Sequence, residues 1–159
     1  MIELAKINDL DTIVTIATYT RNDMIKQGLN QWLGNYPNID YFREDFKNKG
    51  LFVYLINNQI IASISILLEN ESAYKEITWL RDYSLVIHRL LVHPDFQQKG
   101  IGKELFQFAI DKARKENFKS IKIDTHPDNF KMQRLILKFG FKKIGYLSKI
   151  NRLAYELVL

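Results

Sequence analysis

The residues best suited to chemistry lie between Leu90 and Gly102, where the sequence reads Leu-Leu-Val-His-Pro-Asp-Phe-Gln-Gln-Lys-Gly-Ile-Gly. Glycine lets backbone N–H groups approach an oxygen closely, and a helix start leaves unpaired donors at the positive end of its dipole. Phosphate is the natural ligand of such a loop. Neither Gly-x-x-x-x-Gly-Lys-Ser/Thr nor Gly-x-Gly-x-x-Gly is present, which argues against a triphosphate loop and a dinucleotide fold.

A strand and a helix must position this loop. The apolar run 85–92 predicts a buried strand, which Pro94 and Asp95 end. The helix begins at once after Gly100, because apolar residues recur on one face at helical spacing: Ile101, Leu105, Phe106, Ala109 and Ala113.

The rest of the chain predicts alternating strands and helices in one domain, residues 1–159. We expect further strands at 2–7, 51–56, 60–68, 120–125, 141–146 and 152–158, and helices at 10–27, 39–48 and 129–138. Asn8 or Asp9 can cap the first helix, and Asn57-Asn58 forms a hairpin turn. Segment 28–37 is irregular, and segment 69–83 is ambiguous, part loop and part strand. The order indicates an α/β fold, a mixed sheet with helices on both faces.

The pattern Gln97-x-x-Gly100-x-Gly102 resembles the signature of the GNAT superfamily of acyl-CoA-dependent N-acyltransferases. Its flanks strengthen the resemblance: Leu-x-Val-x-Pro before it, Leu105 after it, and a second family-like block at 124–141. Trp32, Tyr36-Pro37, His-Arg-Leu at 88–90 and Asp-Thr-His-x-x-Asn at 124–129 look like a bacterial subgroup. The resemblance implies a mostly antiparallel central sheet flanked by helices on both faces, with a V-shaped split between the fourth and fifth strands.

The resemblance further implies acetyl-CoA as cofactor. Backbone groups of Leu90, Leu91 and Val92 would pair with the pantetheine arm, and one N–H near Leu90 or Leu91 would face the oxyanion. The loop and helix start would hold the pyrophosphate through Gln97, Gln98, Lys99, Gly100, Ile101, Gly102 and Lys103. Asn129 either caps its helix or, as in the family, contacts the cofactor arm.

Two residues are the first candidates for the catalytic base, and Asp82 comes after them. His88 has a suitable ordinary pKa, but a histidine hydrogen-bonded inside the core is the alternative. Glu76 is either a base, a carboxylate that attracts a cationic amine, or a solvated charge. Many relatives place a tyrosine acid five residues before the Phe of the Gly-Phe pair. Here that position is Ile136, which has no proton to donate. Either another group protonates the leaving thiolate, with Tyr146 as a distant candidate, or the thiolate leaves without a proton.

Aromatic residues predict the acceptor region: Trp32 and Tyr36 in the irregular stretch, and Tyr74 with Trp79 further along. Each could instead be a packing aromatic. The leading hypothesis is an N-acetyltransferase that transfers the acetyl group directly to a primary amine of a small molecule or peptide. A non-catalytic acyl-CoA sensor is the alternative, and a nucleic-acid or ribosome-associated module is a third class.

Composition narrows the partners. The net charge of +5 is spread along the chain, which favours steering of a polyanionic cofactor over nucleic-acid binding. The chain has no cysteine and no apolar run near the roughly 18 residues of a membrane helix, so we expect a cytoplasmic protein without a metal or membrane contact. A homodimer could pair through residues 152–158.

Overall fold

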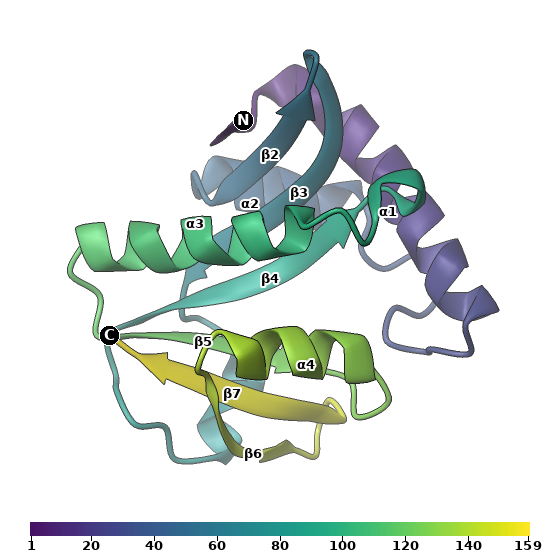
Figure 1. Ribbon diagram of the computed structural model, residues 1–159. Helices are drawn as coiled ribbons and strands as arrows, with labels where there is room; N and C mark the ends of the chain where they lie inside the picture. The colour runs from purple at the N-terminus through teal and green to yellow at the C-terminus, as the bar shows by residue number, and fades with distance from the viewer. The chain divides into compact units, whose positions relative to one another are not determined.

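The computed structural model describes residues 1–159 and places helices and strands along the chain in the order that the apolar patterns predict (Figure 1). The strands are β1 (Ile2–Leu4), β2 (Leu51–Ile56), β3 (Gln59–Leu68), β4 (Ser84–Val92), β5 (Ser120–Thr125), β6 (Lys142–Leu147) and β7 (Arg152–Val158). The helices are α1 (Leu10–Lys26), α2 (Ile39–Lys47), α3 (Ile101–Lys115) and α4 (Phe130–Lys138), with single 3-10 turns η1 (Ile7–Asp9), η2 (Ser72–Glu76) and η3 (Pro94–Phe96).

The strands are hydrogen-bonded in the order β1-β2-β3-β4-β5-β7-β6. β1 with β2, β2 with β3, β5 with β7 and β6 with β7 run antiparallel, whereas β4 and β5 run parallel. The expected mixed, mostly antiparallel sheet is therefore confirmed. The chain divides into two units, one of Met1–Leu67 with His88–Leu105 and the other of Leu68–Ile87 with Phe106–Leu159.

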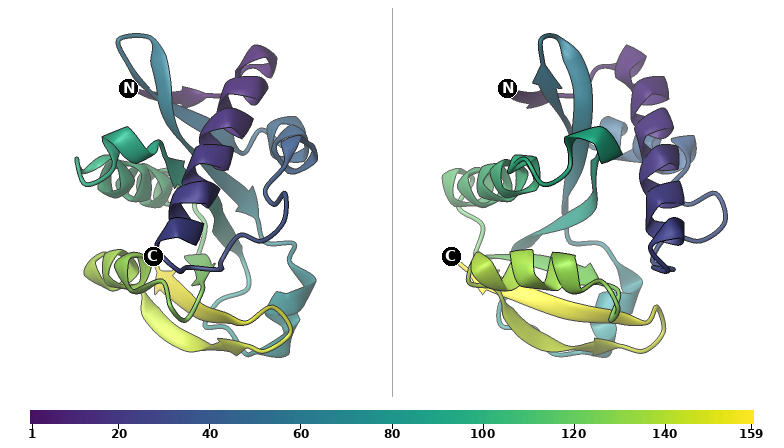
Figure 2. Two further views of the ribbon diagram at one scale, coloured as in Figure 1. Left: turned by 90° about the vertical axis from the view of Figure 1, so that its right-hand side faces the viewer. Right: turned by 45° about the vertical axis from the view of Figure 1, so that its right-hand side comes forward.

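In the first unit, α1 and α2 lie on the same face of β1, β2 and β3 (Figure 2). Apolar residues at helical spacing in α1 pack with Phe42 of α2 and with Leu51 and Val53 of β2. The β2–β3 hairpin turns at Asn57 and Asn58, both left-handed at φ 48° and 61°, as asparagine tolerates in a two-residue turn. This core supports the C-terminal half of β4, whose Leu91 is buried in it.

In the second unit, the two faces of the sheet have different partners. Phe106 of α3 stacks on Phe139 at a ring-centroid distance of 5.4 Å and meets Phe141 edge-on at 6.0 Å. On the other face of the sheet, Tyr74 packs with Val86, Leu147 and Ala154. η2 and the residues around it therefore cover a face of β5 and β7 that a strand pattern alone would leave to solvent.

Four details differ from the sequence predictions. The first strand ends at Leu4, because η1 follows, and the carboxylate of Asp9 accepts a hydrogen bond from the N–H of Lys6 instead of capping α1. Segment 69–83 holds η2 and no strand. Pairing of two copies through residues 152–158 is wrong, because β7 lies between β5 and β6 and both of its edges are already hydrogen-bonded.

Candidate functional site

The loop between β4 and α3 has the backbone of an anion-binding turn. Gln98 and Gly100 are left-handed, at φ 62° and 85°. The carbonyl of Gly100 accepts the N–H of Glu104 at 3.1 Å, so Gly100 is the residue just ahead of the helix. The N–H groups of Ile101 and Gly102 belong to the first turn, and N–H groups there have no carbonyl partners inside the helix. These donors are the ones a phosphate needs.

The side chain of Gln97 has a structural role that accounts for a glutamine at this position of the motif. Its side-chain amide donates to the carbonyl of Val92 at 3.1 Å, and the hydroxyl of Thr20 on α1 approaches the same carbonyl at 3.4 Å. Gln97 thus ties the loop to the end of β4. A Cβ at Gly100 would meet no atom within 4 Å, so the space in front of this glycine is open. Such an open, donor-lined turn fits a diphosphate.

Charges around the loop suit an anion. Lys99 and Lys103 are exposed, and the ammonium of Lys99 lies 5.1 Å from the centroid of the Phe96 ring. Glu104 would repel a phosphate, but its carboxylate accepts the hydroxyl of Tyr54 at 2.7 Å, a hydrogen bond that raises the pKa of Tyr54. The acidic group is therefore held by β2.

His88 lies on β4, two residues before Leu90, and is partly buried. Burial, with the charge of Arg89, lowers the pKa of His88 from 6.5 to about 4, although Asp45 acts in the opposite direction. The ring is neutral at pH 7. Taking a proton from a free ammonium of pKa about 10 would be uphill by roughly six units, or about 8 kcal/mol, so this ring is a weak base.

Arg89 lies within β4 and has a left-handed backbone, φ 46°. Its guanidinium donates through Nε and Nη2 to the carboxylate of Asp45 at 2.7 and 2.6 Å, and through Nη1 to the hydroxyl of Tyr36 at 3.1 Å. It also lies 5.4 Å from the centroid of the Tyr41 ring. Burial works against the charge, but the hydrogen bonds to Asp45 and Tyr36 outweigh it and raise the pKa of Arg89.

The predicted acceptor aromatics of the first unit lie together. The rings of Trp32 and Tyr36 meet edge-on with centroids 6.4 Å apart, and Tyr36 meets Tyr41 at 4.7 Å. Trp32 is buried in the core, whereas Tyr36 is partly exposed. Trp32 therefore supports the stretch 28–37, and Tyr36 joins it to Arg89 beside His88.

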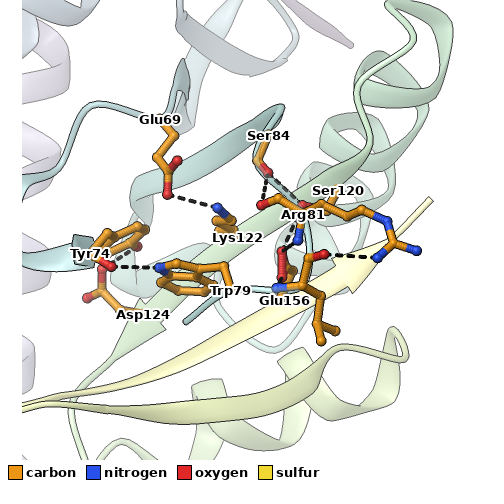
Figure 3. A network of polar contacts seen from close by, with 10 residues as sticks. Glu69, Tyr74, Trp79, Arg81, Ser84, Ser120, Lys122, Asp124 and Glu156 are labelled. Carbon is orange, nitrogen blue, oxygen red and sulfur yellow. Dashed lines mark hydrogen bonds and ion pairs between the residues drawn. The ribbon is translucent and has the colours of Figure 1, made fainter. Parts of the chain in front are cut away.

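Tyr74 belongs to a polar network in the second unit (Figure 3). Its hydroxyl donates to Asp124 at 2.6 Å, and its carbonyl accepts the indole N–H of Trp79 at 2.7 Å. Burial raises the pKa of Asp124, although Tyr74 and Arg152 lower it, and burial raises the pKa of Tyr74 well above 10. Buried Lys122 pairs with Glu69 at 2.9 Å below the Trp79 ring.

The remaining predicted residues have structural partners. Glu76 is exposed, and its carboxylate accepts hydrogen bonds from the N–H and hydroxyl of Ser148 and from the N–H of Lys149. The hydroxyl of Ser148, then the two N–H groups, lower the pKa of Glu76. Asn129 accepts the N–H of Met132 at 3.1 Å, so the capping role is confirmed. Position 136, where the family resemblance predicts a tyrosine, is a buried isoleucine, whose side chain has no proton to donate.

The structure thus brings some predicted residues together. The loop 97–103, Leu90 to Val92, His88, Trp32 and Tyr36 belong to the first unit, whereas Tyr74, Glu76 and Asn129 belong to the second and contact different partners. Sequence reasoning missed Asp45. Its signal was a carboxylate between Phe42 and Phe46 on the apolar face of α2.

Comparison with known proteins identifies the family of this chain. The model of the Acetyltransferase (GNAT) family matches residues 17–141, and the protein therefore belongs to the GNAT acetyltransferase family. A GNAT-family acetyltransferase of Streptococcus agalactiae 2603 is 26% identical with a TM-score of 0.89, covering 100% of this chain and 95% of that one. The expected GNAT fold is confirmed.

Two further matches are more distant or partial. The structure of yncA, a putative acetyltransferase from Salmonella typhimurium with its cofactor acetyl-CoA, is 17% identical with a TM-score of 0.75, covering 100% of this chain and 93% of that one, and shows the shared fold. UPF0157 protein YqkA of Bacillus subtilis (strain 168) is 42% identical over 59 residues, 37% of this chain, and the match spans only 17% of that relative's length.

No three His, Asp or Glu side chains gather where they could hold a metal ion. None of the helices is both long enough and apolar enough to cross a bilayer.

Proposed function

We propose that residues 1–159 act as one N-acetyltransferase domain that transfers the acetyl group of acetyl-CoA directly to a primary amine of a small molecule or peptide. The observation that carries this proposal is the turn at Gly100, left-handed at φ 85° and facing open space, at the start of α3. The family match supports it, and so does the acetyl-CoA in the structure of the Salmonella typhimurium relative.

The chain's own groups divide the work. The first-turn N–H groups of α3, with Lys99 and Lys103, would hold the diphosphate. The backbone of Leu90, Leu91 and Val92 would pair with the pantetheine arm, and an N–H near Leu90 would face the carbonyl oxygen as it gains charge. Acetyl-CoA would supply the activated acyl group.

In this proposal His88 accepts a proton from the amine nitrogen late in the reaction. A neutral ring with a pKa of about 4 is a hydrogen-bond acceptor for the amine N–H, and it orients the amine better than it deprotonates it at rest. The amine would attack as its free base, after its ammonium proton has passed to bulk water. Attack on the acyl carbon would make the nitrogen cationic and far more acidic, so its proton could then pass to His88 while the C–S bond to coenzyme A breaks. The contacts of Glu76 with Ser148 and Lys149 favour an anchoring role over a catalytic one.

The acceptor would lie against Tyr36 of the stretch 28–37, with Trp32 as its support. Aromatic rings suit an alkylammonium or an aromatic amine. Tyr74 and Asn129 stay predictions as acceptor and cofactor contacts.

One experiment separates this function from its rival. Calorimetry with acetyl-CoA measures binding, and a panel of small amines and peptides with thiol detection measures turnover. We expect binding, release of thiol with at least one amine, and a lower kcat with an unchanged Kd in His88→Gln. Absence of binding would refute both functions.

A non-catalytic acyl-CoA sensor is the second candidate. The specific observation in its favour is Ile136, buried where many relatives have a tyrosine acid, together with the low basicity of His88. Binding without turnover over the whole panel would establish the sensor.

A further inference from the structure

Asp45 is a charged residue with 1% of its surface exposed, on the apolar face of α2. Its Oδ1 accepts Nη2 of Arg89 at 2.6 Å, and its Oδ2 accepts Nε of Arg89 at 2.7 Å and the hydroxyl of Ser65 on β3 at 2.5 Å. The pair joins α2, β3 and β4 inside the first unit.

Stability alone is a poor reason for this arrangement. Burying two charges costs desolvation energy that their attraction often fails to recover, and apolar residues of similar volume commonly do as well. The left-handed backbone of Arg89 adds strain, because its Cβ crowds the neighbouring carbonyl. Strained residues persist where their surroundings fix them, and they concentrate at functional sites.

The pair holds two functional segments of the proposed site. Arg89 stands between His88 and the Leu90 to Val92 segment, so its backbone sets the direction of the N–H groups that follow. Its Nη1 donates to the hydroxyl of Tyr36, and Arg21 approaches the carbonyl of Tyr36 at 3.4 Å. One guanidinium therefore contacts the acceptor stretch while its own backbone belongs to the acyl-holding strand.

We propose that Asp45 and Arg89 are positioning residues that couple the acceptor stretch 28–37 to β4, an inference that rests on the proposed function. Asp45 fixes the guanidinium, the guanidinium fixes Tyr36, and the backbone of Arg89 fixes the N–H groups after it. The distance between the acceptor amine and the acyl carbon then depends on a buried carboxylate that touches neither.

A double-mutant cycle tests this coupling. Asp45→Asn and Tyr36→Phe each keep the side-chain shape. We expect each to lower kcat/KM for the acceptor about tenfold, and the double variant also about tenfold rather than a hundredfold, because both act through Arg89. Asp40→Asn is the matched control on the same helix, since Asp40 pairs with Arg43 in an exposed position, and it should leave kcat/KM unchanged. Additive losses in the double variant would overturn the coupling.

Two further variants separate the backbone from the charge. Glycine adopts a positive φ without strain, so Arg89→Gly should keep at least threefold more kcat than Arg89→Ala, while both raise the acceptor KM. Equal kcat values would overturn the role of the backbone conformation. Calorimetry with acetyl-CoA and circular dichroism establish that each variant is folded.

Amide hydrogen exchange gives a readout that needs no turnover. Asp45→Asn should speed exchange at least tenfold at residues 36 and 89–91, relative to Asp40→Asn. If the wild type binds acetyl-CoA but acetylates no amine, the proposed function fails, while this exchange result still decides the coupling. Unchanged protection at these residues would overturn it.

Discussion

Replacement of Gly100 by alanine tests the diphosphate turn. Gly100 is left-handed at φ 85°, and its added Cβ meets no atom within 4 Å, so the cost to folding is backbone strain of about 1–2 kcal/mol. For a chain of 159 residues this lowers Tm by roughly 2–8 °C. Gly140→Ala is the matched control, since Gly140 has φ 86° and its Cβ would lie 3.8 Å from Leu157, an ordinary contact.

The two variants should differ only in their affinity for coenzyme A. A methyl group in the open space at Gly100 displaces a phosphate from its N–H donors, and a hydrogen bond to a charged group is worth about 1.5–3 kcal/mol. Affinity for coenzyme A should therefore fall about tenfold or more. At a ligand concentration 100 times the wild-type Kd, the ligand stabilises the wild type by about 2.7 kcal/mol, and after a tenfold loss by about 1.4 kcal/mol.

Thermal melting with and without coenzyme A measures both effects in one assay. We expect similar Tm values for the two variants without ligand, a full ligand shift in Gly140→Ala, and a shift of about half or less in Gly100→Ala. Equal ligand shifts would mean that the turn before α3 does not hold the diphosphate.

Other predictions concern protonation and anchoring. The folded state resists protonation of His88, whose pKa is lowered from 6.5 to about 4, so about 3 kcal/mol of stability is present above pH 6.5 and is lost as the pH falls to 4. In His88→Gln, urea titrations should lack this acid loss, and an unchanged loss would contradict it. Tyr74→Phe removes a hydrogen bond that lowers the pKa of Asp124, so its deficit of about 1.5–3 kcal/mol at pH 7 should shrink at pH 4, because acid favours protonation of this carboxyl, whose pKa is raised by burial. An equal deficit at both pH values would refute the assignment. Glu76→Gln should speed amide exchange at residues 148 and 149 while kcat stays the same, and a large fall in kcat would instead restore Glu76 as a base.

Elements with one apolar face were predictable from the sequence. The face of α3 that carries Ile101, Leu105 and Ala109 is buried as its spacing requires. The turn at Asn57 and Asn58 also followed from local chemistry, because asparagine accepts the left-handed backbone. Local periodicity and turn chemistry need no knowledge of distant residues, so they survive in a single sequence.

The Asp45–Arg89 pair was not predictable in this way. The two residues lie 44 positions apart, and nothing near Arg89 in the sequence indicates a carboxylate partner or a left-handed backbone. The same holds for β7, whose place between β5 and β6 depends on pairing and not on its own residues. The Asp45–Arg89 pair and the place of β7 both depend on contacts between residues far apart in the sequence, and such contacts leave no pattern in the local sequence.

The buried polar face of β5 has a physical cause of its own. Ser120, Lys122 and Asp124 alternate with isoleucines, a pattern that indicates a solvated face, yet segment 69–83 covers it. Because that segment forms no strand, its backbone N–H groups need other acceptors, and Glu156 of β7 accepts those of Leu80 and Arg81 at 2.7 and 3.0 Å. Polar side chains on a strand face can thus form hydrogen bonds either with water or with an irregular backbone segment. The alternating sequence pattern is identical in the two cases, so it does not distinguish an exposed face from a covered one.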